Sequence, residues 1–76
     1  MNNEIIIEIV DDLNHKMKSC LNGDWTPTQC LHYAYGMHKT IETFIANDII
    51  KHEDFEEALH LISNFMGVME HFMKYE

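Results

Sequence analysis

The last helical segment of this chain carries a wider apolar surface than one neighbouring helix covers. Apolar residues recur there at alternating steps of four and three, the spacing of one buried helical side: Phe55, Leu59, Ile62, Met66, Met69 and Met73. A second stripe with the same alternation runs beside it: Leu61, Phe65, Val68, Phe72 and Tyr75. At about 100° per residue, the two stripes together span about half of the helix circumference. Such a helix must be covered by other helices of the chain or by a second molecule.

A first helix is expected over residues 3–21. Its apolar side is a stripe with helical spacing: Ile6, Val10, Leu13, Met17 and Cys20. Asn22 and Gly23 then end it, because glycine adopts the left-handed backbone conformation without steric cost.

The start of the second helix is the best-marked local feature. Thr26 and Gln29 have the spacing of a capping box, and Pro27 takes the first helical position, where its missing N–H costs nothing. Trp25 and Cys30 are then placed as a hydrophobic staple.

The second helix is expected over residues 27–47 and the third over residues 53–75. The buried face of the second is predicted to be Cys30, Ala34, Met37, Ile41, Phe44 and Ile45. Because neither glycine nor proline follows the second helix, one continuous helix over the second and third segments is an alternative. We favour a break, since Ile50 would point to the polar side of a continuous helix and an acidic first turn follows it. Residues 1–76 are therefore expected to form a single all-α, three-helix antiparallel bundle, closed on itself or completed by a dimer through the third helix.

Charge narrows the classes of partner. Thirteen acidic against five basic residues among the 76 give a net charge of -8, which argues against direct binding to nucleic acid or to an anionic membrane. The acidic cluster is Glu53, Asp54, Glu56 and Glu57. It either compensates the helix dipole, the interpretation we prefer, or docks a basic partner.

The apolar run near Ile5 is short and split by Glu8, so we expect neither an export signal nor a membrane span. We therefore expect a cytoplasmic protein whose cysteines are reduced.

Metal and catalytic sites are not expected. Glu57 and His60 have the spacing of di-iron ligands, but they lie opposite the apolar stripe and should face solvent. Cys30 and His32 point in nearly opposite directions on one helix, so they cannot hold zinc together with Cys20. His38 with Glu42 is interpreted as an ordinary helix-surface pair, and the sequence lacks nucleophile and phosphate-loop motifs. We therefore expect no cofactor and no enzyme.

Two surfaces are candidates for contact with another molecule. His32, Tyr35 and Lys39 form a row on the second helix, with Gly36 allowing close approach, although single exposed aromatics are also common on plain surfaces. The second stripe of the third helix is either the seam to another helix of the bundle or a working surface. Leaving four of its large side chains exposed would forgo about 6–12 kcal/mol of burial, which favours a partner or a second copy.

The sequence thus leads to a functional hypothesis. We predict that this chain is a small acidic, non-catalytic protein that binds another protein, acts as an inhibitor or adaptor, and self-associates as a homodimer. A basic nucleic-acid-processing enzyme is one target class. The alternatives are a metal-binding or redox protein that uses its histidines and cysteines, and a structural subunit of an assembly.

Overall fold

The chain folds into three helices joined by two short connections. The computed structural model describes residues 3–76, and its helices are α1 (Asn3–Leu21), α2 (Pro27–Ala46) and α3 (His52–Met73). The predicted all-α, three-helix bundle is confirmed, and each helix ends within two residues of its expected position. The break between α2 and α3 is also confirmed.

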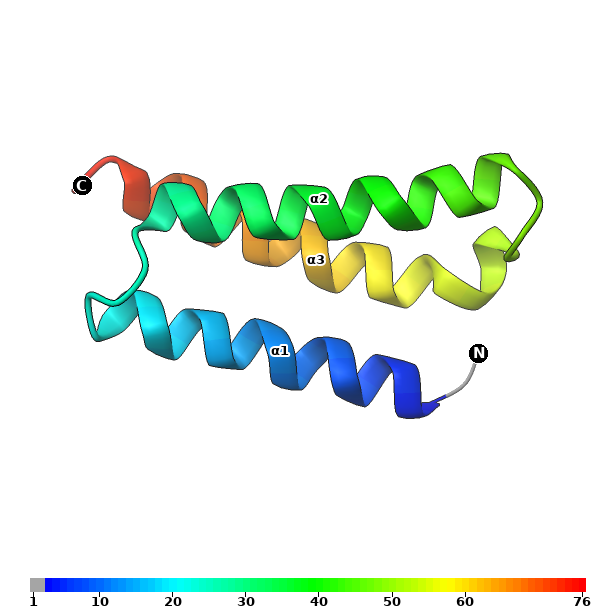
Figure 1. Ribbon diagram of the computed structural model, residues 1–76, viewed down its shortest axis with the longest axis horizontal. Coiled ribbons are helices and arrows are strands. Elements are labelled where there is room, and N and C mark those ends of the chain that lie inside the picture. The colour runs from blue at the N-terminus through cyan, green and yellow to red at the C-terminus, as the bar shows by residue number, and fades with distance from the viewer. Residues whose placement is uncertain (1–2) are drawn as a thin grey trace.

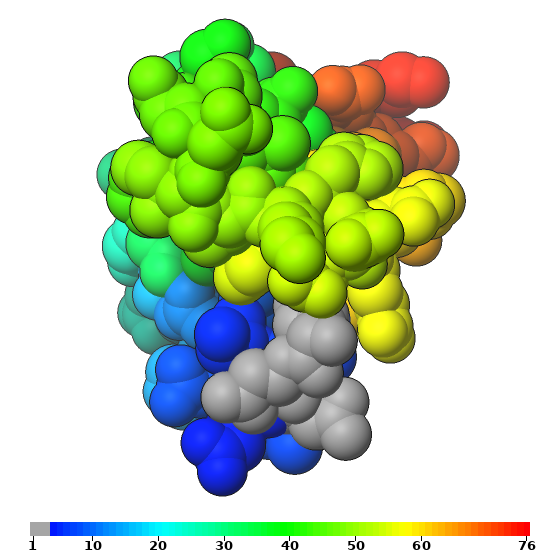
Figure 2. Space-filling view, turned by 90° about the vertical axis from the view of Figure 1, so that its right-hand side faces the viewer, coloured from blue at the N-terminus to red at the C-terminus, as the bar shows by residue number. Residues whose placement is uncertain are grey.

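The helices α2 and α3 form the closest pair, and α1 packs along one side of it. Figure 1 shows α2 and α3 running antiparallel beside each other, with α1 below them and its first residues at the same end as the connection between α2 and α3. The space-filling view in Figure 2 looks onto that end, where the connection lies above the start of α1. The molecule is elongated, with extents of 39 × 22 × 15 Å.

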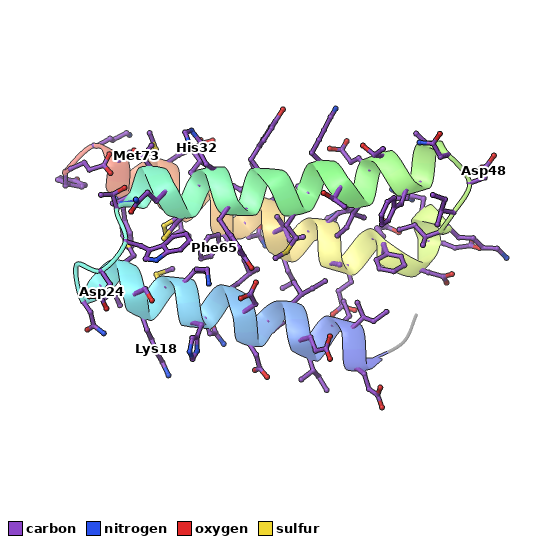
Figure 3. All side chains as sticks on the ribbon, viewed as in Figure 1. Lys18, Asp24, His32, Asp48, Phe65 and Met73 are labelled. Carbon is purple, nitrogen blue, oxygen red and sulfur yellow. The ribbon has the colours of Figure 1, made fainter. Side chains whose placement is uncertain are left out.

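The core lies where the apolar sides of all three helices meet. Its buried side chains are Leu13, Cys30, Ala34, Ile41, Ala58, Ile62, Phe65 and Met69. In Figure 3 the side chain of Phe65 lies between the helices. Ile62 and Met69 of the first stripe of α3 are fully buried, and Phe55, Leu59 and Met66 pack against the core, as their spacing predicted.

The connection between α1 and α2 follows its sequence signals. Gly23 has a φ of +82°, and the N–H groups of Gly23 and Asp24 donate to carbonyls of the last turn of α1. The capping box of α2 is confirmed: the Thr26 N–H donates to Gln29 Oε1 at 2.9 Å, and the Gln29 N–H donates to Thr26 Oγ1 at 3.1 Å. Sequence and structure therefore agree on this turn in detail.

The connection between α2 and α3 uses the same hydrogen-bond motif without a glycine. The Ile49 N–H donates to the Phe44 carbonyl at 2.9 Å, and the Asp48 N–H donates to the Ile45 carbonyl at 3.1 Å. Asp48 occupies the left-handed position with a φ of +58°. An L-amino acid with a side chain is strained there, so this helix end costs free energy that Gly23 avoids in the first connection.

Replacing Asp48 by glycine is expected to stabilise the fold. The substitution Asp48→Gly removes the left-handed strain and should raise the free energy of unfolding by about 1 kcal/mol, measured by urea denaturation. The matched control is Asp24→Gly, because Asp24 follows the end of α1 with an ordinary φ. We expect no stabilisation there, and an equal gain in both variants would contradict the strain at Asp48.

A cation–aromatic cluster ties α1 to the rest of the bundle. The ammonium of Lys16 lies 5.0 Å from the ring centroid of Trp25 and 4.7 Å from that of Tyr33. It also lies 3.6 Å from Asp12 Oδ1, and the Tyr33 hydroxyl donates a hydrogen bond to the same carboxylate. The two rings meet edge to face at 5.9 Å. These contacts fix the C-terminal half of α1 against the first turns of α2.

This cluster predicts a dependence of stability on alkaline pH. The hydrogen bond to Asp12, with burial as a smaller cause, raises the pKa of Tyr33 from 10.0 to about 12. The folded state thus favours the neutral phenol, and its contribution to stability is complete below pH 10 and is lost as the pH rises through about 12. Over this interval the free energy of unfolding of the wild type should fall more steeply than that of Tyr33→Phe, measured by urea denaturation at a series of pH values. If the free energy of unfolding falls equally with pH in the two proteins, the hydrogen bond from Tyr33 to Asp12 does not contribute to stability.

Glu76 links the C-terminal end of the chain to the first turn of α2, at the end of the bundle opposite the connection between α2 and α3 (Figure 1). The carboxylate of Glu76 accepts hydrogen bonds from the Thr28 hydroxyl at 2.6 Å and from the Thr28 N–H at 3.2 Å. These bonds lower the pKa of Glu76. The carboxylate therefore sits at the N-terminus of α2, where the helix dipole favours a negative charge.

None of the helices in the described part of the chain combines the length and apolar content needed to cross a bilayer.

Candidate interaction surface

The outward face of α2 forms a shallow hollow on the surface of the bundle. We call it the α2 face, and the residues that line it are Tyr35, Gly36, Lys39, Thr40, Thr43 and Phe44. All of them are exposed, whereas Ala34 and Ile41 of the same helix are buried in the core. The α2 face is consequently carried by a helix that the core holds in place.

The two threonine hydroxyls of the α2 face are satisfied by the helix itself. The Thr40 hydroxyl donates to the Gly36 carbonyl, and the Thr43 hydroxyl donates to the Lys39 carbonyl, both at 2.8 Å. Such bonds direct the threonine hydroxyls toward the backbone. An apolar group can then cover the hollow without stripping water from an unpaired hydroxyl.

Two aromatic rings flank the hollow. Tyr35 is 57% exposed and Phe44 is 42% exposed, although large apolar side chains gain free energy by burial. Gly36 follows Tyr35 at one end of the hollow, and a Cβ atom built there meets no heavy atom within 4 Å. A second backbone can therefore approach α2 closely beside Tyr35, and a partner that runs along the hollow would also bury Phe44, about two turns further along α2.

The predicted row on α2 is reproduced by the structure. His32, Tyr35 and Lys39 are all exposed on the outward side of α2, and Tyr35 and Lys39 line the hollow. His32 lies closer to the start of the helix, and Figure 3 shows it on the edge of α2 away from α1. Two of the three residues thus belong to the α2 face, and the third lies beside it.

Phe44 corrects the expected buried face of α2. The spacing of the helix placed Phe44 with Ile41 and Ile45 in the core, yet its ring is substantially exposed. Residue 44 lies about 60° around the helix from Ile41, at the edge of the buried side. That angular offset is the sequence signal by which Phe44 could have been recognised as a member of the α2 face.

The second stripe of α3 divides between the core and the surface. Phe65 is buried, Leu61 and Phe72 are half-buried, and Phe72 packs against the core cluster. Val68 and Tyr75 remain exposed, at 39% and 78%. The ring of Tyr75 meets His71 edge to face at 5.6 Å. The structure therefore does not bring the stripe together as one exposed surface.

The acidic cluster lies on the outward side of α3. Glu53, Glu56 and Glu57 are exposed, and with His60 they line a shallow hollow. Asp54 is half-buried, apart from the other three. The exposure expected for Glu57 and His60 is confirmed, so this pair does not face the bundle interior as di-iron ligands do.

The cysteines and histidines do not gather into a ligand set in residues 3–76. Groups of three or more histidine, cysteine, aspartate or glutamate side chains with metal-binding geometry are absent from this part of the chain. Cys30 is fully buried, and burial together with the neighbouring Cys20 raises the pKa of its thiol. Both cysteines are free thiols, and they lie against each other at the junction of α1 and α2.

Searches against protein-family models, curated proteins and solved structures found no match to this chain.

Proposed function

We propose that this chain is a small non-catalytic module that binds another protein through the α2 face and acts as an inhibitor or adaptor. One observation carries the proposal. Tyr35 and Phe44 present large aromatic surface at the two ends of a hollow whose threonine hydroxyls are already bonded, and Gly36 beside Tyr35 leaves room for a partner. Binding hot spots are typically aromatic side chains surrounded by groups that exclude water without energetic cost.

A partner helix or strand fits this surface better than a small molecule does. The hollow is shallow and lined by a single helix, whereas small ligands require clefts that enclose most of their surface. A rigid helical face also loses little conformational entropy on binding, which favours affinity.

Charge points to a basic partner. The chain carries a net charge of -8, and Glu53, Glu56 and Glu57 stand exposed on α3, the helix paired with α2. Complementary charge accelerates encounter and disfavours acidic competitors. We therefore infer a basic target, with cytoplasmic nucleic-acid-processing enzymes as the first class to examine.

Self-association through α3 stays a prediction with a smaller surface than the sequence suggested. With Phe65 buried and Phe72 half-buried against the core, Val68 and Tyr75 are the exposed members of the second stripe that could meet a second copy. Sedimentation equilibrium at high micromolar concentration tests it directly. A monomer would rule out the homodimer and leave the α2 face unaffected.

The proposal is tested by filling the hollow without disturbing the fold. In Gly36→Gln a side chain enters the α2 face beside Tyr35, and in Gly67→Gln the same change is made on α3, where a Cβ atom also meets nothing within 4 Å. Both substitutions replace a mid-helix glycine by a better helix former, so both variants should fold. We expect tagged wild type and Gly67→Gln to recover the same protein from the native host, and Gly36→Gln to lose it. Equal recovery by all three baits would place the binding surface elsewhere.

A further inference from the structure

Three side chains form a hydrogen-bonded row across the junction of α2 and α3. His38 Nδ1 lies 2.7 Å from Glu42 Oε1 on the next turn of α2, and His38 Nε2 lies 3.4 Å from Ser63 Oγ on α3. A carboxylate can only accept hydrogen bonds, so Nδ1 of His38 carries a hydrogen and donates a hydrogen bond to Glu42. In the neutral ring, Nε2 is then the acceptor that faces the Ser63 hydroxyl.

These positions correspond to a nucleophile, its base and a carboxylate that orients the base. The side chain of His38 is only 23% exposed, so the two packed helices restrict its ring. Ser63 is exposed and can be reached from solvent. One turn further along α3, Gly67 carries no side chain, and a Cβ atom there would meet nothing within 4 Å. The space beside the hydroxyl is thus open to a reagent.

We propose that Ser63 is an acylation site that accepts an acyl group from an activated ester or thioester. His38 acts as the base in this step, and Glu42 is a positioning residue. The proposal concerns a covalent modification of α3 and does not depend on partner binding at the α2 face.

The reaction balances without an oxidant or a cofactor. Ser63 Oγ forms a bond to the carbonyl carbon of the donor while its proton passes to His38 Nε2. The bond from that carbon to the leaving oxygen or sulfur then breaks, and the leaving group takes the proton from Nε2. The products are an O-acylated Ser63 and a free alcohol or thiol.

The surroundings of Ser63 favour one acylation over repeated turnover. Backbone amides in the middle of α2 and α3 are engaged in helical hydrogen bonds, so the developing oxyanion is stabilised by water and not by preorganised donors. An activated ester or thioester reacts under these conditions more readily than the alkyl ester formed on Ser63. The acylated protein should therefore accumulate.

The test uses p-nitrophenyl acetate as donor and locates the acetyl group by peptide mass spectrometry. The chain's other serine, Ser19, lies half-buried at the end of α1 and is the internal control. We expect Ser63 to be acetylated at least about a hundredfold faster than Ser19, which is the typical gain from a positioned general base. His38→Gln should remove this difference, with circular dichroism confirming that the variant folds. Equal labelling of the two serines in the wild type, or acetyl transfer to the His38 ring instead of Ser63, would overturn the proposal.

The role of Glu42 needs a separate readout. Nitrogen-15 NMR of the histidine rings should show the Nδ1-protonated tautomer of His38 in the wild type and a change in tautomer population in Glu42→Gln, together with slower Ser63 acetylation. An unchanged tautomer with an unchanged rate would exclude Glu42 from the site, and slower acetylation with an unchanged tautomer would show that it does not act by positioning the ring.

Discussion

Replacing Phe65 by alanine is expected to lower the free energy of unfolding by about 3–5 kcal/mol. Phe65 is only 7% exposed and belongs to the core cluster that Leu13 of α1 also joins. Removing the ring loses its burial and leaves a cavity among three helices that cannot all collapse onto it. Urea denaturation followed by circular dichroism measures the change.

The matched control is Val68→Ala on the same stripe of α3. Val68 is 39% exposed, so truncating it should cost less than about 1 kcal/mol. Because a loss of 3–5 kcal/mol is a large part of the stability of any small domain, Phe65→Leu serves as a milder variant if the alanine protein does not fold. Equal, small losses at both positions would mean that the second stripe is not the seam between α3 and the rest of the bundle.

Placing a charge on the α2 face is expected to weaken partner binding strongly. In Tyr35→Asp an aromatic ring is replaced by a carboxylate, which would be buried without a partner in the complex. We expect a loss of about 2–4 kcal/mol of binding free energy, or about 30-fold to 1,000-fold in Kd, as for other hot-spot aromatics. Isothermal titration with the protein recovered by the wild-type bait measures it.

Tyr75→Asp separates the effect of the surface from the effect of the added charge. Tyr75 is 78% exposed on the second stripe, and the substitution changes the net charge of the chain by the same amount. A basic partner should bind this variant with nearly wild-type affinity. If Tyr75→Asp weakens binding and Tyr35→Asp does not, the second stripe is the binding surface.

The helices and the first connection could be predicted because their signals are local. The spacing of the apolar stripes defined the helices. The Thr26–Gln29 capping box and Gly23 start and end helices through hydrogen bonds and backbone conformations that involve only residues a few positions away. The end of α2 was harder to predict, because Asp48 adopts a left-handed conformation that is usually adopted by glycine. The break was inferred instead from the pattern on either side of it.

The division of the second stripe could not be predicted from α3 alone. Periodicity indicates which residues share a side of a helix, whereas the position of α1 decides which of them are covered. Phe65 is buried and Val68 is exposed for this reason, although they lie three residues apart on one stripe. The hydrogen bonds of Ser63 with His38 and of Glu76 with Thr28 could not be predicted for the same reason, since each joins residues far apart in the sequence.

Photo-crosslinking shows directly whether the α2 face touches the partner. A benzoyl-phenylalanine residue is incorporated in place of Tyr35 in one sample and of Tyr75 in another, and each is irradiated in the native host. We expect a covalent adduct with one basic protein from position 35 and none with that protein from position 75. An adduct from position 75 alone would show that the second stripe, and not the α2 face, touches the partner.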